Sequence, residues 1–89
     1  MNLRRLAKGR ECQVRLPGVC NGNPETTVLA HYRLAGISGI GMKSPDLIGA
    51  WACSDCHYTV DNVKGDDVRL AHAEGVFRTQ AILLKEELI

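Results

Sequence analysis

The chain has 89 residues and a formal net charge of +1 at neutral pH. This length predicts one domain, residues 1–89, and this charge does not by itself indicate a nucleic-acid partner. The aromatic residues Trp51, Phe77, Tyr32 and Tyr58 can fill only a thin core, and such domains usually depend on a disulfide or a metal. Because no segment resembles a signal peptide or a membrane span, we expect a cytoplasmic protein without membrane contact, whose four cysteines stay reduced.

The N-terminal part of the chain predicts a short helix and then a hairpin. Residues 3–8 favour a helix that ends at a glycine, and residues 13–16 favour a strand. The Pro-Gly pair at 17–18 is a turn signal, so Cys12 and Cys20 should face each other across the hairpin. Basic residues crowd this same segment, namely Arg4, Arg5, Lys8, Arg10 and Arg15. We expect Arg10 and Arg15 to contact nucleic-acid phosphate, the alternative being a solvated helix face.

The middle of the chain predicts two strands joined by a glycine-rich loop. Residues 26–32 are rich in β-branched and apolar side chains and carry His31 near the end of a predicted strand. Residues 36–41 lack the glycine spacing of a dinucleotide-binding loop, so they predict a connector or a substrate-facing loop. Residues 47–52 favour a second strand, interrupted by Gly49, which leads directly into Cys53.

The C-terminal half predicts two helices. Ser54 or Asp55 can cap the first, which runs to about Asn62, and Asp66 can cap a long helix that runs nearly to Ile89. Apolar residues recur along the long helix at steps of three and four, namely Leu70, Ala73, Phe77, Ala81, Leu84 and Leu88. We expect this stripe to join Trp51 in the core, although the same stripe could form a homodimer.

The four cysteines predict a structural zinc site. Cys53 and Cys56 form a C-x-x-C pair at a predicted helix start, where the helix N-terminus stabilises thiolates, and Cys12 and Cys20 complete four ligands. His57 could instead replace one of these cysteines as a zinc ligand. The C-x-x-C-H sequence is also a c-type haem attachment motif, but that reading requires export and leaves the first two cysteines without a role.

Three polar residues remain once the zinc has four thiolates. His57 and Asp61 are four residues apart, so they share a helix face and could hold one divalent cation such as Mg²⁺. His31 could face that cation and act as a general base. We interpret His72 as structural, and Arg33 as a phosphate contact close to the predicted base.

This order of residues resembles the HNH, or ββα-metal, nucleases, and in particular the small YbcO-type nucleases of prophages. The resemblance covers residues 10–61 and is closest over 9–25, which read GRECQVRLPGVCNGNPE. A more distant relative is the RecA-dependent nuclease Ref, which has a basic arm that this chain lacks. The resemblance implies a small α+β, zinc-stapled, treble-clef-like ββα-metal domain with a long C-terminal helix.

The resemblance also implies the role of each site residue. His31 would be the base, His57 and Asp61 would hold the catalytic cation, and DNA would be the substrate. The chain departs from the family pattern at Ala30, where a histidine or an acid usually binds metal, and at the middle asparagine, for which Asp46 is the nearest polar match.

We therefore expect a metal-dependent DNA endonuclease of phage or prophage type, a hydrolase of phosphodiester bonds that serves recombination or repair. Its expected cofactors are a structural Zn²⁺ and a catalytic Mg²⁺ or other divalent cation. The alternative is a non-catalytic zinc-finger module that binds DNA or protein. Only His31, His57 and Asp61 separate the two hypotheses.

Overall fold

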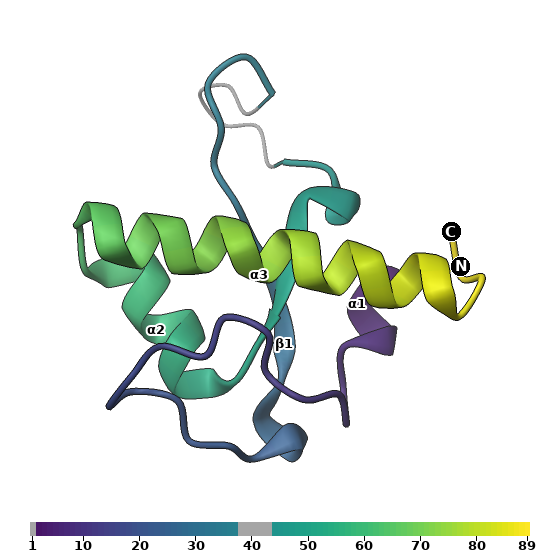
Figure 1. The fold of residues 1–89 in the computed structure, drawn as a ribbon, viewed down its shortest axis with the longest axis horizontal. Coiled ribbons are helices and arrows are strands. Elements are labelled where there is room, and N and C mark those ends of the chain that lie inside the picture. Colours follow the sequence, from purple (N-terminus) through teal and green to yellow (C-terminus); the bar gives the residue numbers. More distant parts are fainter. Residues whose placement is uncertain (1, 38–43) are drawn as a thin grey trace.

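Two short strands and one long helix form the centre of the fold, in a computed structural model that describes residues 2–37 and 44–89. The chain forms, in order, α1 (Leu3–Leu6), a 3₁₀ turn (Pro24–Thr26), β1 (Val28–His31), a second 3₁₀ turn (Asp46–Ile48), β2 (Gly49–Ala52), α2 (Ser54–Asn62) and α3 (Asp66–Lys85). Figure 1 shows α3 crossing the whole molecule, with the strands behind it. None of the described helices is long and apolar enough to cross a membrane.

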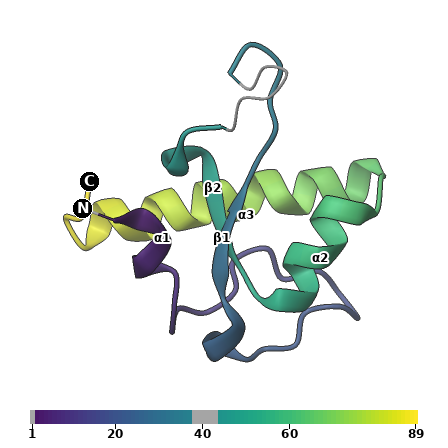
Figure 2. The same ribbon diagram turned by 180° about the vertical axis from the view of Figure 1, so that it is seen from behind.

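The strands form a two-stranded antiparallel sheet in which Val28 pairs with Ala52 and His31 with Gly49. All four residues of β2 are buried, because α3 covers one face of this strand and β1 occupies one of its edges. Viewed from the other side, the strands lie in front of α3, between α1 and α2 (Figure 2). The predicted strands at 26–32 and 47–52 are therefore confirmed in shortened form.

On the second edge of β2, the backbone N–H and C=O of Trp51 form hydrogen bonds with groups from outside the sheet. The backbone N–H of Trp51 donates a hydrogen bond to Oγ1 of Thr79, and the carbonyl of Trp51 accepts one from the N–H of Gln13. Thr79 is 1% exposed and its hydroxyl donates in turn to the carbonyl of Gly75. Buried backbone groups must find such partners, so this pair of contacts lets a two-stranded sheet form the core of the domain.

The predicted hairpin between Cys12 and Cys20 is wrong. Residues 13–16 form a bend rather than a strand, and Arg15 has a φ of +54°, in the left-handed region that no strand residue occupies. The N–H of Arg15 points to the sulfur of Cys12, at 3.4 Å, instead of a strand partner. The segment bends so that the N–H of Gln13 reaches β2 and the N–H of Arg15 reaches the cysteine cluster.

The buried face of α3 also differs from the prediction. Leu70, Phe77 and Leu84 are 60%, 67% and 62% exposed, and the side that packs inward consists of Val68, His72, Gly75, Val76, Thr79 and Leu83. A Cβ atom at Gly75 would lie 3.0 Å from Cγ2 of Val14, so the small residues let α3 approach the chain closely. Helical spacing identified an apolar stripe, but close packing selected the other face. Trp51, 2% exposed, is core as predicted.

The helix boundaries are close to those predicted. Cys53 rather than Ser54 caps α2, because its sulfur accepts the N–H of Cys56, and Gly65 precedes α3, whose first residue is Asp66. Helix α3 ends at Lys85 instead of continuing towards Ile89. Helix α1 ends at Leu6, before the predicted Lys8. Of the predicted glycine-rich loop, residues 38–41 lie outside the described residues.

The Thr79 hydroxyl should carry a measurable part of the stability. Replacing Thr79 with Val keeps the shape but leaves the N–H of Trp51 without its acceptor, so the free energy of unfolding should fall by about 1–3 kcal/mol. Thr79→Ser keeps the hydroxyl and should lose less. Urea denaturation of the three proteins tests this, and a Val variant as stable as the wild type would contradict it.

Candidate functional site

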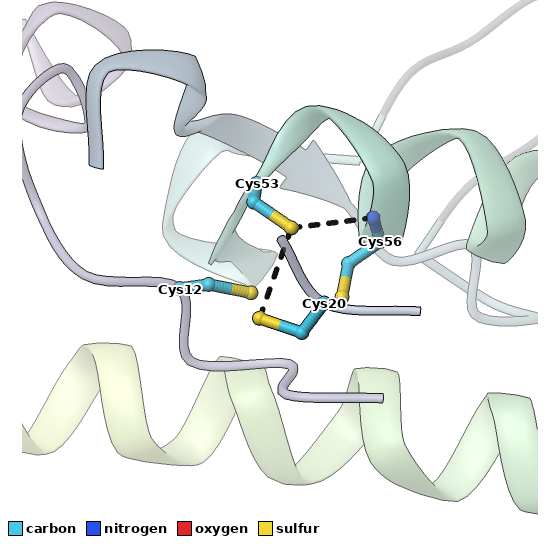
Figure 3. Close-up of side chains that lie close together, drawn as sticks. All are labelled: Cys12, Cys20, Cys53 and Cys56. Atoms are coloured by element: carbon cyan, nitrogen blue, oxygen red, sulfur yellow. Dashed lines mark hydrogen bonds between the residues drawn. The ribbon is translucent and has the colours of Figure 1, made fainter. Parts of the chain in front are cut away.

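The four cysteines converge on one point of the fold. Cys12 and Cys20 come from the bent N-terminal segment, and Cys53 and Cys56 from the start of α2, as Figure 3 shows. Their sulfur atoms all lie within 4.8 Å of one another. Cys20 and Cys53, whose sulfurs are 3.9 Å apart, are not joined by a disulfide, and all four thiols are free. The cluster could therefore hold one metal ion such as zinc.

Backbone N–H groups point at these sulfurs. Cys53 accepts from the N–H of Cys56 at 3.4 Å and from that of Asn21 at 3.5 Å, and Cys12 accepts from Arg15. Such donors stabilise the thiolate form, which is the form that binds metal. Backbone donors from the N-terminal segment and from α2 thus converge on the cysteine cluster.

Burial and backbone hydrogen bonds have opposite effects on the pKa values of the thiols. Burial alone would raise the pKa of Cys53, but the N–H groups of Cys56 and Asn21 outweigh it and lower that pKa to about 7. Burial, together with the neighbouring thiols, holds the pKa values of Cys20 and Cys56 above the ordinary value. Four thiolates this close repel one another, and a bound divalent cation removes that repulsion. The donor set, four mostly buried thiols, fits zinc.

His31 lies at the end of β1 with its ring fixed by a carboxylate. Its Nε2 is 2.7 Å from Oδ1 of Asp46, and Nε of Arg4 approaches the same oxygen at 3.4 Å. The hydrogen bond from His31, and then the charge of Arg4, hold the pKa of Asp46 below its ordinary value. An ionised carboxylate only accepts, so Nε2 carries a proton, and in the neutral form of the ring Nδ1 is the nitrogen with the lone pair.

His57 and Asp61 lie on an exposed face of α2. Nε2 of His57 is 3.2 Å from Oδ2 of Asp61, as the spacing of four residues predicts, and the two side chains are 41% and 57% exposed. Cys56, one residue before His57, is fully buried in the cysteine cluster. One turn of helix therefore presents a thiol to the interior and an imidazole to solvent.

A pocket of about 560 Å³ opens where the end of β1, the end of α2 and the start of α3 meet. The predicted residues His31, Arg33 and Asp61 all line it. The pocket thus brings the predicted base, one predicted cation ligand and one predicted phosphate contact into a single space. His57 is not among its lining residues and reaches this site through its contact with Asp61.

Two further cations line the pocket, Lys64 and Arg69, and sequence reasoning missed both. Lys64 follows Asp61 by three residues across the end of α2, and Arg69 lies one turn into α3. Arg69 stacks over the ring of Tyr32 at 5.1 Å. The sequence did contain a signal for them: Lys64 lies just after the predicted end of one helix and Arg69 just after the predicted start of the next. Residues on either side of such a break are brought close together where the two helix ends meet.

His72 forms the buried wall of the pocket. It is 6% exposed, its Nε2 donates to the carbonyl of Ala30 at 2.9 Å, and its ring packs edge-on against Tyr32. Burial holds the pKa of His72 below its ordinary value, so the ring stays neutral. It therefore supports the backbone just before His31. Ala30 is 1% exposed and points into the core.

Arg10 and Arg15 lie away from the pocket lining. Arg10 donates to both carboxylate oxygens of Glu86 at 2.7 Å and covers the ring of Trp51, 4.8 Å from its centroid. Arg15 bonds to the carbonyl of Cys12 and the side chain of Gln13. Both arginines have contacts that hold the fold, and their predicted phosphate contacts stay a prediction.

The fold and the site define a small α+β domain in which a four-cysteine cluster lies beside a pocket lined by histidine, carboxylate and basic residues. The family model described as "Putative nuclease YbcO" matches residues 1–88. The chain therefore belongs to the YbcO family.

Three similar proteins carry phage-related or nuclease names. Two of them, the "Putative nuclease YbcO" of Escherichia coli (strain K12) and the "Putative nuclease ybcO" of Enterobacteria phage 82, are each 55% identical over 99% of this chain and 96% of their own length. A solved structure titled "Structure of a putative bacteriophage protein from Escherichia coli str. K-12 substr. MG1655" is 50% identical, with a TM-score of 0.81 over 97% of this chain and all of that chain. The architecture described above is thus shared with a solved relative.

The metal assignment predicts a specific pattern of loss. The purified protein should carry about one tightly held zinc per chain. Cys53→Ser should lose this zinc and much of the thermal stability, because the remaining thiols no longer form a tetrahedral set. His57→Ala should keep both, since His57 lies outside the cluster. Elemental analysis and thermal unfolding measure the two effects, and loss of zinc in His57→Ala would make His57 a zinc ligand instead.

Proposed function

We propose that this protein is a metal-dependent DNA endonuclease of the HNH, or ββα-metal, type, encoded by phage or prophage. The observation that carries this proposal is the shared pocket of His31, Asp61 and Arg33, with His31 fixed by Asp46. The order β1, β2, α2 supports the ββα assignment, and a cysteine cluster beside it supports a treble-clef-like knuckle. The nuclease names of the family and its phage relative support the reaction.

His31 acts as the general base. The proton on Nε2 is held by Asp46, so Nδ1 accepts the proton of the attacking water. Asp46 also stabilises the imidazolium that this transfer creates, as a carboxylate does behind a catalytic histidine in other hydrolases. After the hydrogen bond from His31, the charge of Arg4 at the surface makes a smaller contribution that lowers the pKa of this carboxylate.

His57 and Asp61 would hold the catalytic divalent cation. Their donor atoms, 3.2 Å apart on a solvent-exposed helix face, offer two ligands and leave room for water and substrate phosphate. When bound, Mg²⁺ or a similar cation neutralises the charge that develops on the phosphate and on the leaving 3′ oxygen.

Basic residues around the pocket bind the DNA backbone. Arg33, Lys64 and Arg69 approach the pocket from three different segments, after β1, after α2 and within α3. Phosphate contacts of this kind position a nucleic acid without reading its sequence. Arg10 and Arg15 would add further phosphate contacts only if the DNA backbone replaced their present partners within the chain. The activity belongs in the cytoplasm, in phage recombination or repair.

One observation favours a second function, a zinc module that binds DNA or protein without cutting it. Ala30 occupies the position where related nucleases place a further metal ligand, and it is buried with no side-chain donor. Such a module would keep the zinc cluster and the basic pocket, but it would have no use for the fixed imidazole of His31.

A plasmid-nicking assay separates the two functions. The wild type should convert supercoiled plasmid to the open circle in the presence of Mg²⁺ or Mn²⁺, and His31→Ala should reduce the rate about 10²- to 10⁴-fold, because a general base is lost. Zinc content and DNA binding should be unchanged in the variant. A wild type that binds DNA and never nicks it would favour the non-cutting module, and equal cutting by the variant would remove His31 as the base.

Asp46 should act as a positioning residue for His31. In Asp46→Asn the amide can donate to Nε2, which then favours a proton on Nδ1, the wrong tautomer for a base. The turnover rate should fall at least about tenfold with little change in DNA affinity. Arg4→Gln, which keeps the carboxylate, should retain most of the rate. A change in DNA affinity with unchanged turnover would show that Asp46 serves binding instead.

A further inference from the structure

Helix α3 exposes a line of apolar side chains to solvent. Leu70, Phe77 and Leu84 are all at least 60% exposed, and Ala81 is exposed between them. Figure 1 shows α3 across the front of the molecule, and within the described part of the chain no other element lies over it. Soluble monomers rarely leave large side chains in a continuous stripe, so a stripe of this kind marks an interaction surface.

The spacing of the stripe is symmetrical about Phe77. Leu70 and Leu84 lie seven residues before and after it, and Ala73 and Ala81 lie four residues before and after it. Both intervals are close to whole helical turns, so all five positions fall on one side of α3. A two-fold contact between identical chains needs a surface that is complementary to itself. In an antiparallel pair, each leucine would meet the other leucine of the partner, and the two Phe77 rings would meet at the axis.

The charges beside the stripe are complementary in the antiparallel direction. Asp67 and Glu74 lie towards the start of α3, and Arg78 and Lys85 lie towards its end. With Phe77 at the two-fold axis, Asp67 comes within two residues of the position of Lys85 of the partner subunit. Glu74 comes equally close to Arg78 of the partner subunit.

Arg78 is held in place by a contact within the chain. Its guanidinium donates to the carbonyl of Gln13 through both Nε, at 2.9 Å, and Nη2, at 2.7 Å. The guanidinium is therefore held against the segment before Val14 rather than spread over many rotamers, which lowers the entropic cost of ordering this side chain in a contact.

We propose that two copies of this chain associate through α3 in an antiparallel, two-fold contact centred on Phe77. The proposal does not depend on the nuclease function, because none of the stripe residues lines the pocket. The stripe that sequence periodicity assigned to the monomer core thus becomes the interface between monomers.

Sedimentation equilibrium on the zinc-loaded protein tests the association. The wild type should have twice the 9.7 kDa mass of one chain at micromolar concentration. Phe77→Glu places two carboxylates at the axis and should weaken the dimer by about 30-fold or more. The matched control is Tyr58→Glu, since Tyr58 is 68% exposed on α2 and should leave the dimer unchanged. A monomeric wild type, or a Phe77→Glu variant that dimerises as well as the control, would overturn the proposal.

The direction of the pair is tested by cross-linking and by charge exchange. When Leu70→Cys and Leu84→Cys proteins are mixed and mildly oxidised, the mixed disulfide should dominate, and a majority of Leu70–Leu70 and Leu84–Leu84 products would make the helices parallel. Lys85→Glu should weaken the dimer several-fold, and adding Asp67→Lys should restore it. Failure of the double variant to recover would remove the proposed register.

Discussion

The close approach of four cysteine sulfurs, which would repel one another as thiolates, is the constraint on which the rest of this structure depends. Sulfur atoms within 4.8 Å of one another cannot all ionise unless a cation joins them. The segment from Cys12 to Cys20 has no strand and no helix of its own, and its path is set by contacts such as the N–H of Arg15 to the sulfur of Cys12 and the N–H of Gln13 to the carbonyl of Trp51. A domain with so few large core residues has little else with which to join this segment to α2.

Helix α2 connects that constraint to the candidate chemistry. Its first turn begins in the cysteine cluster, and its exposed face carries His57 and Asp61. A cation held by the cysteines would therefore fix the origin of the helix and, through it, the direction of both side chains. In β1, too, neighbouring residues face opposite ways: Ala30 is buried in the core, and the next residue, His31, reaches the pocket.

Helix α3 supports three parts of the molecule at once. Thr79 satisfies the open edge of β2, His72 holds the carbonyl before His31, and Arg69 adds a cation to the pocket. At Gly75 and Thr79 the helix comes too close to Val14 and to β2 to accommodate a larger side chain. Leu70, Phe77 and Leu84 lie on the opposite side, where a second chain can cover them.

The sequence by itself determined the features that depend on local chemistry. Four cysteines with a C-x-x-C pair predicted the cluster, the spacing of His57 and Asp61 predicted their contact, and turn and capping residues predicted α2 and α3 to within a few positions. These features follow from residue spacing along one helix or from the number of ligands that a zinc ion requires. They do not require knowledge of which segments meet.

Tertiary structure alone decided the features that depend on packing. His31 and Asp46, which pair in the fold, are distant in sequence. Lys64 and Arg69 reach one pocket from opposite sides of a helix break. The inward face of α3 is likewise defined only by the segments that pack against it. Periodicity could identify the stripe of Leu70, Phe77 and Leu84 but could not say what it faced. The reason is physical: a helix turns towards its sheet the side that lets the two backbones come closest, and that side is defined only once Thr79 and Gly75 meet β2 and Val14.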